Sequence, residues 1–131
     1  MIRSLAVAFA LLAASPAFAQ DSPVAGSWSG YWISDTSGHR GPLRATVRPV
    51  DGGSAYRATY RGRFAAVIPF RYSMTMNVVG SDGGTTYLAG EQRLPLFGTF
   101  RYSATVTDAD FVSSFDARRD RGRFVMTRTG R

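Results

Sequence analysis

The sequence predicts an all-β protein, and three observations support this. Residues 62–79, GRFAAVIPFRYSMTMNVV, alternate between apolar and polar side chains, as expected of a strand with one buried face. Glycine and aspartate turn signals recur at short, regular intervals, and no segment after residue 19 has a helical period. The predicted inner face of the long alternating stretch carries Ile68, Phe70, Tyr72, Met74, Met76 and Val78.

Eight strands are expected, at residues 26–34, 42–50, 54–64, 66–79, 84–92, 96–107, 110–118 and 121–129. Large side chains interleave with glycine and alanine on the inner faces, as a narrow barrel interior requires. A sheet of eight sequential antiparallel strands has two exposed edges unless it closes on itself. The pattern therefore predicts a closed, antiparallel, up-and-down β-barrel, and a two-sheet β-sandwich is the alternative.

Residues 1–19 are expected to be a secretory signal peptide. Arg3 precedes the apolar stretch 5–14, Pro16 ends that stretch, and Ala17-Phe18-Ala19 provides a small-x-small cleavage site. The apolar stretch is too short to span a bilayer, so no transmembrane span is expected after cleavage. A single domain, residues 20–131, would remain. The chain has no cysteine, which favours a bacterial periplasmic or secreted protein and excludes thiol catalysis.

The basic residues are all arginines, and the formal net charge is +7. A turn at residues 51–54 would pair Val50 with Ala55, and a turn after Phe64 would pair that residue with Ile68. This register brings five arginines together on the outer surface, here called the arginine face: Arg44, Arg48, Arg57, Arg61 and Arg71.

Like charges at directly opposed strand positions are destabilising. The arginine face therefore predicts an anionic partner, such as lipid headgroups or an acidic polysaccharide. Because the face lacks interleaved aromatic residues, nucleic acid is not the expected partner. The alternative is a solvated surface that only confers solubility.

Two short features resemble the calycin group, which contains the lipocalins and avidins. Gly26-Ser27-Trp28 opens the first strand, and Arg128 lies in the last. The segments 111–115 and 120–128 are also similar to the final hairpin of small bacterial calycin-like barrels. The resemblance implies the barrel architecture and a cation–π contact between Arg128 and Trp28. The chain lacks the C-terminal helix of lipocalins and the later tryptophans of an avidin biotin site, so no ligand is implied.

Seven residues predicted to point inward are candidates to contact a small apolar ligand: Trp28, Trp32, Tyr56, Tyr60, Tyr72, Met74 and Tyr102. Buried tyrosine hydroxyls need hydrogen-bond partners, and methionine adapts to irregular pockets. A barrel of eight strands is either filled by its own side chains or has room for one small ligand. Both possibilities remain open from the sequence.

Catalytic motifs are sparse. The single histidine, His39, lies in an expected loop without a nucleophile motif, and Glu91 is the only glutamate. Asp108 and Asp110 lie in an expected turn, where carboxylates usually cap the backbone. We therefore expect a non-catalytic protein with no metal and no cofactor. The leading hypothesis is an exported barrel that holds a small apolar ligand, and the alternative is an interaction module that uses the arginine face.

Overall fold

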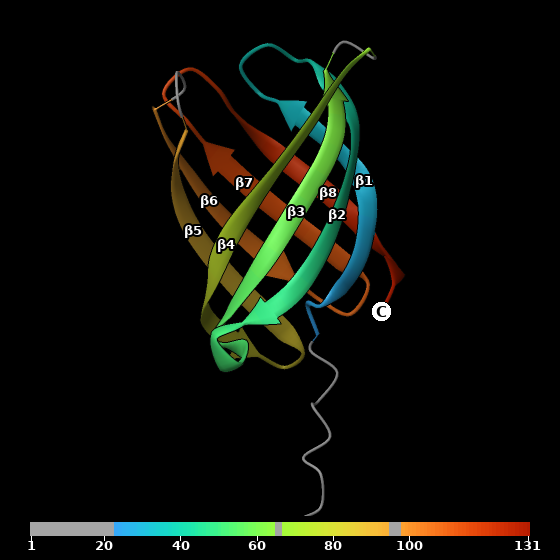
Figure 1. Ribbon diagram of the computed structural model, residues 1–131, viewed down its shortest axis with the longest axis vertical. Helices are drawn as coiled ribbons and strands as arrows, with labels where there is room; N and C mark the ends of the chain where they lie inside the picture. Colours follow the sequence, from blue (N-terminus) through green and yellow to red (C-terminus); the bar gives the residue numbers. More distant parts are fainter. Residues whose placement is uncertain (1–22, 65–66, 95–97) are drawn as a thin grey trace, which may run out of the picture.

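The computed structural model describes residues 23–64, 67–94 and 98–131, which form a closed β-barrel (Figure 1). Each described strand pairs antiparallel with its neighbour in sequence, and the last strand pairs with the first. The predicted up-and-down barrel is therefore confirmed, and the sandwich alternative is wrong. The predicted signal peptide, residues 1–19, lies outside the described residues.

The strands are β1 (Gly26–Ser34), β2 (Arg40–Val50), β3 (Ala55–Phe64), β4 (Ile68–Asp82), β5 (Thr85–Leu94), β6 (Gly98–Val106), β7 (Asp110–Asp116) and β8 (Arg121–Gly130). A short 3-10 turn, η1 (Asp51–Gly53), connects β2 to β3. Among the described residues, no helix is long and apolar enough to cross a membrane.

The end of β4 is where the predicted boundary was furthest from the structure. The sequence predicts an end at residue 79, but the strand continues to Asp82. A register shift between Val78 and Gly80 preserves the pairing beyond that point. Gly83 and Gly84 both adopt positive φ, as a two-residue hairpin turn requires, so the pairing extends to the turn.

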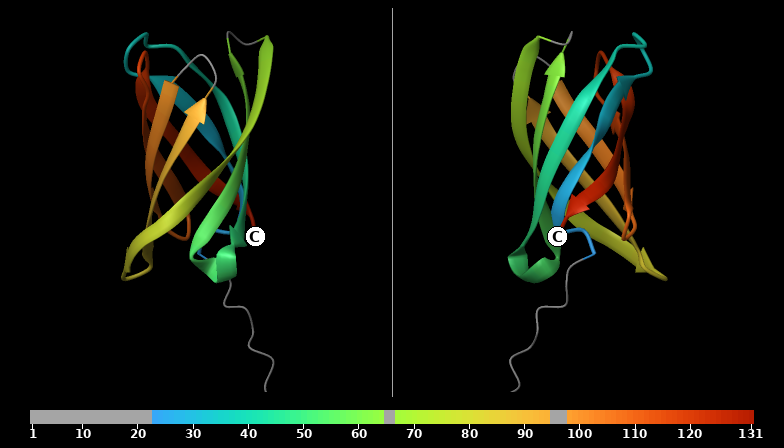
Figure 2. Two further views of the ribbon diagram at one scale, coloured as in Figure 1. Left: turned by 60° about the vertical axis from the view of Figure 1, so that its left-hand side comes forward. Right: turned by 90° about the vertical axis from the view of Figure 1, so that its right-hand side faces the viewer.

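The barrel has two ends that differ in their connections (Figures 1 and 2). We call the end at which β1, β3, β5 and β7 finish the upper end. The lower end has the β2–β3, β4–β5 and β6–β7 connections and the C-terminus. Strands β4 and β5 pair only in their lower part, from Asn77–Ala89 to Asp82–Thr85, and they diverge toward the upper end (Figure 1).

Side chains at alternate strand positions fill the barrel, as the alternation predicts. The largest fully buried ones include Trp28, Tyr60, Phe111, Met74 and Met76. Ile68 was expected inside, but its side chain is 58% exposed. Ile68 is the first residue of β4 and pairs with Phe64 at the upper rim. The alternation of side chains continues to this rim, but the packed core ends below it.

Candidate functional site

The arginine face has the register predicted from the sequence. Arg44 pairs with Arg61, Arg61 pairs with Arg71, and Arg48 pairs with Arg57. All five residues are exposed on the outer surface of β2, β3 and β4. The strands therefore bring together charges that are far apart in sequence.

In the described part of the chain, no ion pair joins these five arginines to a carboxylate. Within the described residues, salt bridges join Arg101 to Glu91, Arg121 to Asp116, Arg123 to Asp35 and Arg131 to Asp108. None of these pairs involves the arginine face. Arg57 donates a hydrogen bond to the Thr75 hydroxyl at 3.3 Å, which leaves its charge in place. The face is thus a cationic surface whose charge is free to act on a partner.

A groove of about 430 Å³ lies beside the centre of this face. Arg44 and Arg61 line it together with five hydroxyl-bearing residues: Ser27, Ser29, Thr46, Thr59 and Thr129. The described lining contains no carboxylate. Guanidinium groups and hydroxyls together provide the donors that bind phosphate or sulfate oxygens. We call this site the arginine–hydroxyl groove.

The hydroxyls of this groove were not identified from the sequence. Ser27 and Ser29 come from β1 and Thr129 from β8, whereas both arginines come from β2 and β3. Only the closure of the barrel brings β8 beside β1. The sequence signal that could have identified these hydroxyls is the alternation of side chains, which places them on the outer face.

A second groove, of about 530 Å³, differs in charge. It lies over β4 to β7, and its lining includes Arg101, Glu91 and Asp116. The Arg101 Nε atom lies 3.8 Å from the Glu91 carboxylate. Since nearby acidic groups offset this arginine, the second groove is a weaker candidate for an anion.

The seven candidate ligand contacts all point into the barrel. Six of them are buried, and Tyr72 is half-buried. Their rings pack on one another: Tyr60 stacks on Tyr72 with ring centroids 5.1 Å apart, and Tyr60 lies 5.2 Å from Phe124. The hydroxyls of Tyr60 and Tyr102 are hydrogen-bonded to each other. These side chains therefore largely pack against and hydrogen-bond to one another. Their role in binding a ligand stays a prediction.

Burial controls the ionisation of the central tyrosines. It raises the pKa of Tyr60, Tyr72 and Tyr102 well above the usual range, and repulsion from Tyr102 adds to the effect on Tyr60 and Tyr72. The Tyr72 hydroxyl is buried and has no hydrogen-bond partner among the described residues. Phe70 and Phe100, both partly buried, flank Tyr72 on the side toward the upper end. The Tyr72 hydroxyl is therefore an unsatisfied polar group among the aromatic rings of the upper interior.

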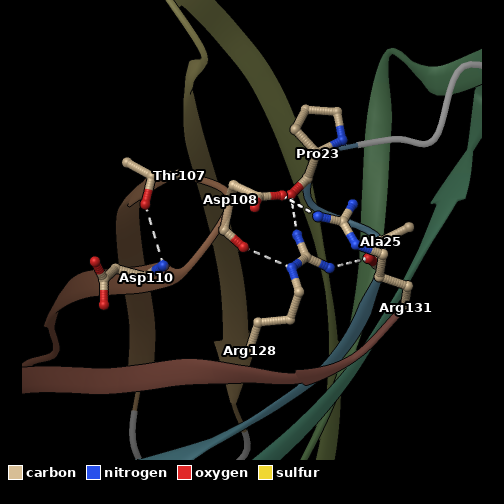
Figure 3. A network of polar contacts seen from close by, with 7 residues as sticks. All are labelled: Pro23, Ala25, Thr107, Asp108, Asp110, Arg128 and Arg131. Atoms are coloured by element: carbon tan, nitrogen blue, oxygen red, sulfur yellow. Dashed lines mark hydrogen bonds and ion pairs between the residues drawn. The ribbon is translucent and has the colours of Figure 1, made fainter.

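Trp28 lies in the lower end of the barrel. Its indole N–H donates to the Val24 carbonyl at 3.0 Å, and the Arg128 guanidinium lies 4.3 Å from its ring centroid. The predicted cation–π contact is therefore confirmed. Arg128 also donates to the carbonyl groups of Asp108, Ala25 and Pro23 (Figure 3). We call this network the Arg128 clasp. Trp28 has a structural role in it.

The two turn aspartates also have structural contacts. The Asp110 backbone N–H donates to the Thr107 hydroxyl at 3.1 Å, and the Asp108 carboxylate pairs with Arg131 (Figure 3). Within the described residues, no three His, Cys, Asp or Glu side chains are grouped to hold a metal ion. The turn at residues 107–110 therefore belongs to the Arg128 clasp.

No protein-family model and no curated protein matches the chain. Among solved structures, it is similar to the crystal structure of Rv2717c from M. tuberculosis, with a TM-score of 0.62 and 15% sequence identity. The similarity covers 88% of this chain and 98% of that chain. At this identity the likeness shows a shared fold, so the barrel is supported and membership of the calycin group stays a prediction.

Proposed function

We propose that this protein is an exported, non-catalytic binding protein whose arginine face binds clustered phosphate or sulfate groups. The partner would be an anionic surface or polymer, such as lipid headgroups or an acidic polysaccharide. One observation carries the proposal: Arg44 and Arg61 lie opposite each other in a groove that has five hydroxyl-bearing residues and no described carboxylate.

The spacing of the arginines supports binding to several anionic groups at once. Neighbouring strands lie about 5 Å apart, so Arg44, Arg61 and Arg71 extend from backbones that span about 10 Å. A long, flexible guanidinium can form two parallel hydrogen bonds with one phosphate or sulfate. A partner with adjacent anionic groups can therefore engage two or three arginines, which relieves the repulsion between them.

The test replaces Arg44, Arg61 and Arg71 with glutamine and measures binding to dextran sulfate and to polyphosphate. The wild-type protein should bind both, with an affinity that falls steeply as salt is added. The triple variant should bind at least about tenfold more weakly, because it loses several charge-assisted hydrogen bonds.

A matched control separates the site from the net charge. Arg101→Gln, Arg121→Gln and Arg123→Gln together remove the same charge, but each of these arginines has a carboxylate partner. This control should retain most of the binding. If both triple variants lose affinity equally, net charge alone explains the binding and the arginine face is not a site.

A second candidate is a small, mostly apolar ligand in the upper interior. The unpartnered Tyr72 hydroxyl, with Phe70 and Phe100 beside it, supports this alternative. Native mass spectrometry of protein purified from its own host should then reveal an adduct of small mass that Tyr72→Phe reduces. A bare mass for the wild-type protein would count against this candidate.

A further inference from the structure

Exposed apolar side chains gather on one hairpin at the upper end. Six large apolar residues are exposed among the described residues, and three of them lie in this hairpin: Phe64, Val67 and Ile68. Their exposed fractions are 46%, 76% and 58%. We call these three residues the apolar tip. Such a cluster at the end of a barrel is a typical site for contact with an apolar partner.

Three arginines lie directly behind the apolar tip, on the same two strands. Arg63 is adjacent to Phe64, and Arg61 pairs with Arg71 farther down the barrel. All three are exposed. Arg61 is three residues from Phe64, a distance of about 10 Å along an extended strand. The hairpin is therefore apolar at its end and cationic from about 3 to 10 Å below it.

The two ends of the barrel also differ in charge. We compared the described residues in the connections and within two positions of a strand end. The upper end has seven arginines and three aspartates: Arg40, Arg63, Arg93, Arg118, Arg119, Arg121 and Arg123, with Asp35, Asp116 and Asp120. The lower end has four aspartates and four arginines: Asp51, Asp82, Asp108 and Asp110, with Arg48, Arg57, Arg128 and Arg131. This asymmetry would orient the upper end toward a negatively charged surface.

We infer that the barrel docks with its upper end on an anionic lipid bilayer and inserts the apolar tip into the interface. The inference rests on the proposed function and selects one partner for the arginine face. A hydrophilic polymer would gain nothing from exposed Val67 and Ile68, whereas a membrane interface favours their burial and attracts the arginines behind them.

The depths of the apolar tip and of the arginines behind it match a membrane interface. Apolar groups of interfacial proteins reach roughly 5–10 Å into the boundary between headgroups and acyl chains. With the tip at that depth, Arg61 and Arg71 lie at the level of the lipid phosphates, and the long side chain of Arg63 can extend to the same level. Arg44 in the arginine–hydroxyl groove neighbours Arg61 and would face the same headgroup layer.

A fluorescent label can report this geometry, because the natural chain has no cysteine. The variant Val67→Cys would carry an environment-sensitive nitrobenzoxadiazole label on the tip. Val112→Cys is the matched control, since Val112 is 42% exposed on β7, outside the hairpin. With vesicles of equal parts phosphatidylglycerol and phosphatidylcholine, the Val67 label should shift to the blue and brighten, and the Val112 label should not.

Binding measurements with unlabelled protein separate the two proposals. Val67→Asp with Ile68→Asp should weaken binding to these vesicles by about tenfold or more, since two apolar side chains lose burial. The same change should leave dextran sulfate binding within about twofold of wild type, since a polymer contacts only the arginine face. Val112→Asp should alter neither, and pure phosphatidylcholine vesicles should not bind.

Three results would overturn the inference. If the protein binds dextran sulfate but not the vesicles, the proposed function stands and membrane docking is wrong. If it binds vesicles while the Val67 label remains in water, the arginines adsorb without insertion, and docking through the tip is wrong. If it binds neither probe, both proposals are wrong.

Discussion

Arg128 joins segments that are distant in sequence. Its guanidinium covers Trp28 and donates to carbonyl groups of the turn before β7 and of the segment before β1. Partial burial and the nearby charge of Arg131 lower the pKa of Arg128 from its usual value, and Asp108 opposes this effect. The side chain therefore acts as a cross-link where β8 meets β1.

Replacing Arg128 should destabilise the fold. Arg128→Ala is expected to lower the free energy of unfolding by about 2 kcal/mol, because the clasp loses charge-assisted hydrogen bonds and a cation–π contact. Arg128→Lys should recover only part of this loss, since an ammonium group cannot reproduce the planar fork. Urea denaturation measures both variants.

The control for this prediction is Arg118→Ala. Arg118 is exposed in the β7–β8 connection, and its replacement should change stability little. Equal stability of Arg128→Ala and the wild type would show that the clasp does not contribute to the fold.

At the level of strands, simple alternation predicted most of the architecture. The strand β1 has the predicted bounds, and the pairing of Arg44, Arg61 and Arg71 follows from counting back from two turns. This worked because a one-residue slip would have moved every apolar side chain of β3 to the outside. The burial pattern and the turns therefore specify the same register.

Alternation could not show where a strand leaves the core. Ile68 has the same inward position in the pattern as Met74, yet it lies at the rim and is exposed. For this reason Ile68 was expected inside the barrel. Nor could alternation show that β4 and β5 diverge, because that depends on a local register shift and on the packing of the whole barrel.

A short repeat in the sequence was a further signal. Phe-Arg-Tyr-Ser occurs at residues 70–73 and again at residues 100–103. In both copies the Phe and Tyr side chains point inward. The rings of Tyr72 and Phe100 pack edge to face, and the rings of Phe100 and Tyr102 are stacked. The repeat thus supplies matching rings from β4 and β6 to the upper interior.

At the scale of the whole molecule, the buried tyrosines make stability depend on alkaline pH. An unfolded tyrosine ionises near pH 10, whereas burial keeps Tyr60, Tyr72 and Tyr102 protonated well above that value. Above about pH 10 the unfolded chain therefore binds fewer protons than the folded protein, so stability falls as pH rises. Below pH 10 these groups contribute no pH dependence.

Ultraviolet titration measures this effect, because phenolate absorbance should increase together with unfolding. Tyr60→Phe should flatten the alkaline loss of stability, and Tyr87→Phe, at an exposed position on β5, should not. Ionisation of all the tyrosines at pH 10 without unfolding would contradict the burial of the three central hydroxyls.

The β1–β8 seam described above has a topological consequence. Ser27 pairs with Gly130 and, after a local register shift, Trp28 pairs with Arg128, so the first and last strands form an antiparallel pair as sequence neighbours do. The start of β1 and the end of β8 both lie at the lower end, at the position of a connection between two neighbouring strands. The barrel has no intrinsic starting strand: a circular permutant that joins these ends and opens at the Gly83–Gly84 turn keeps every strand pair.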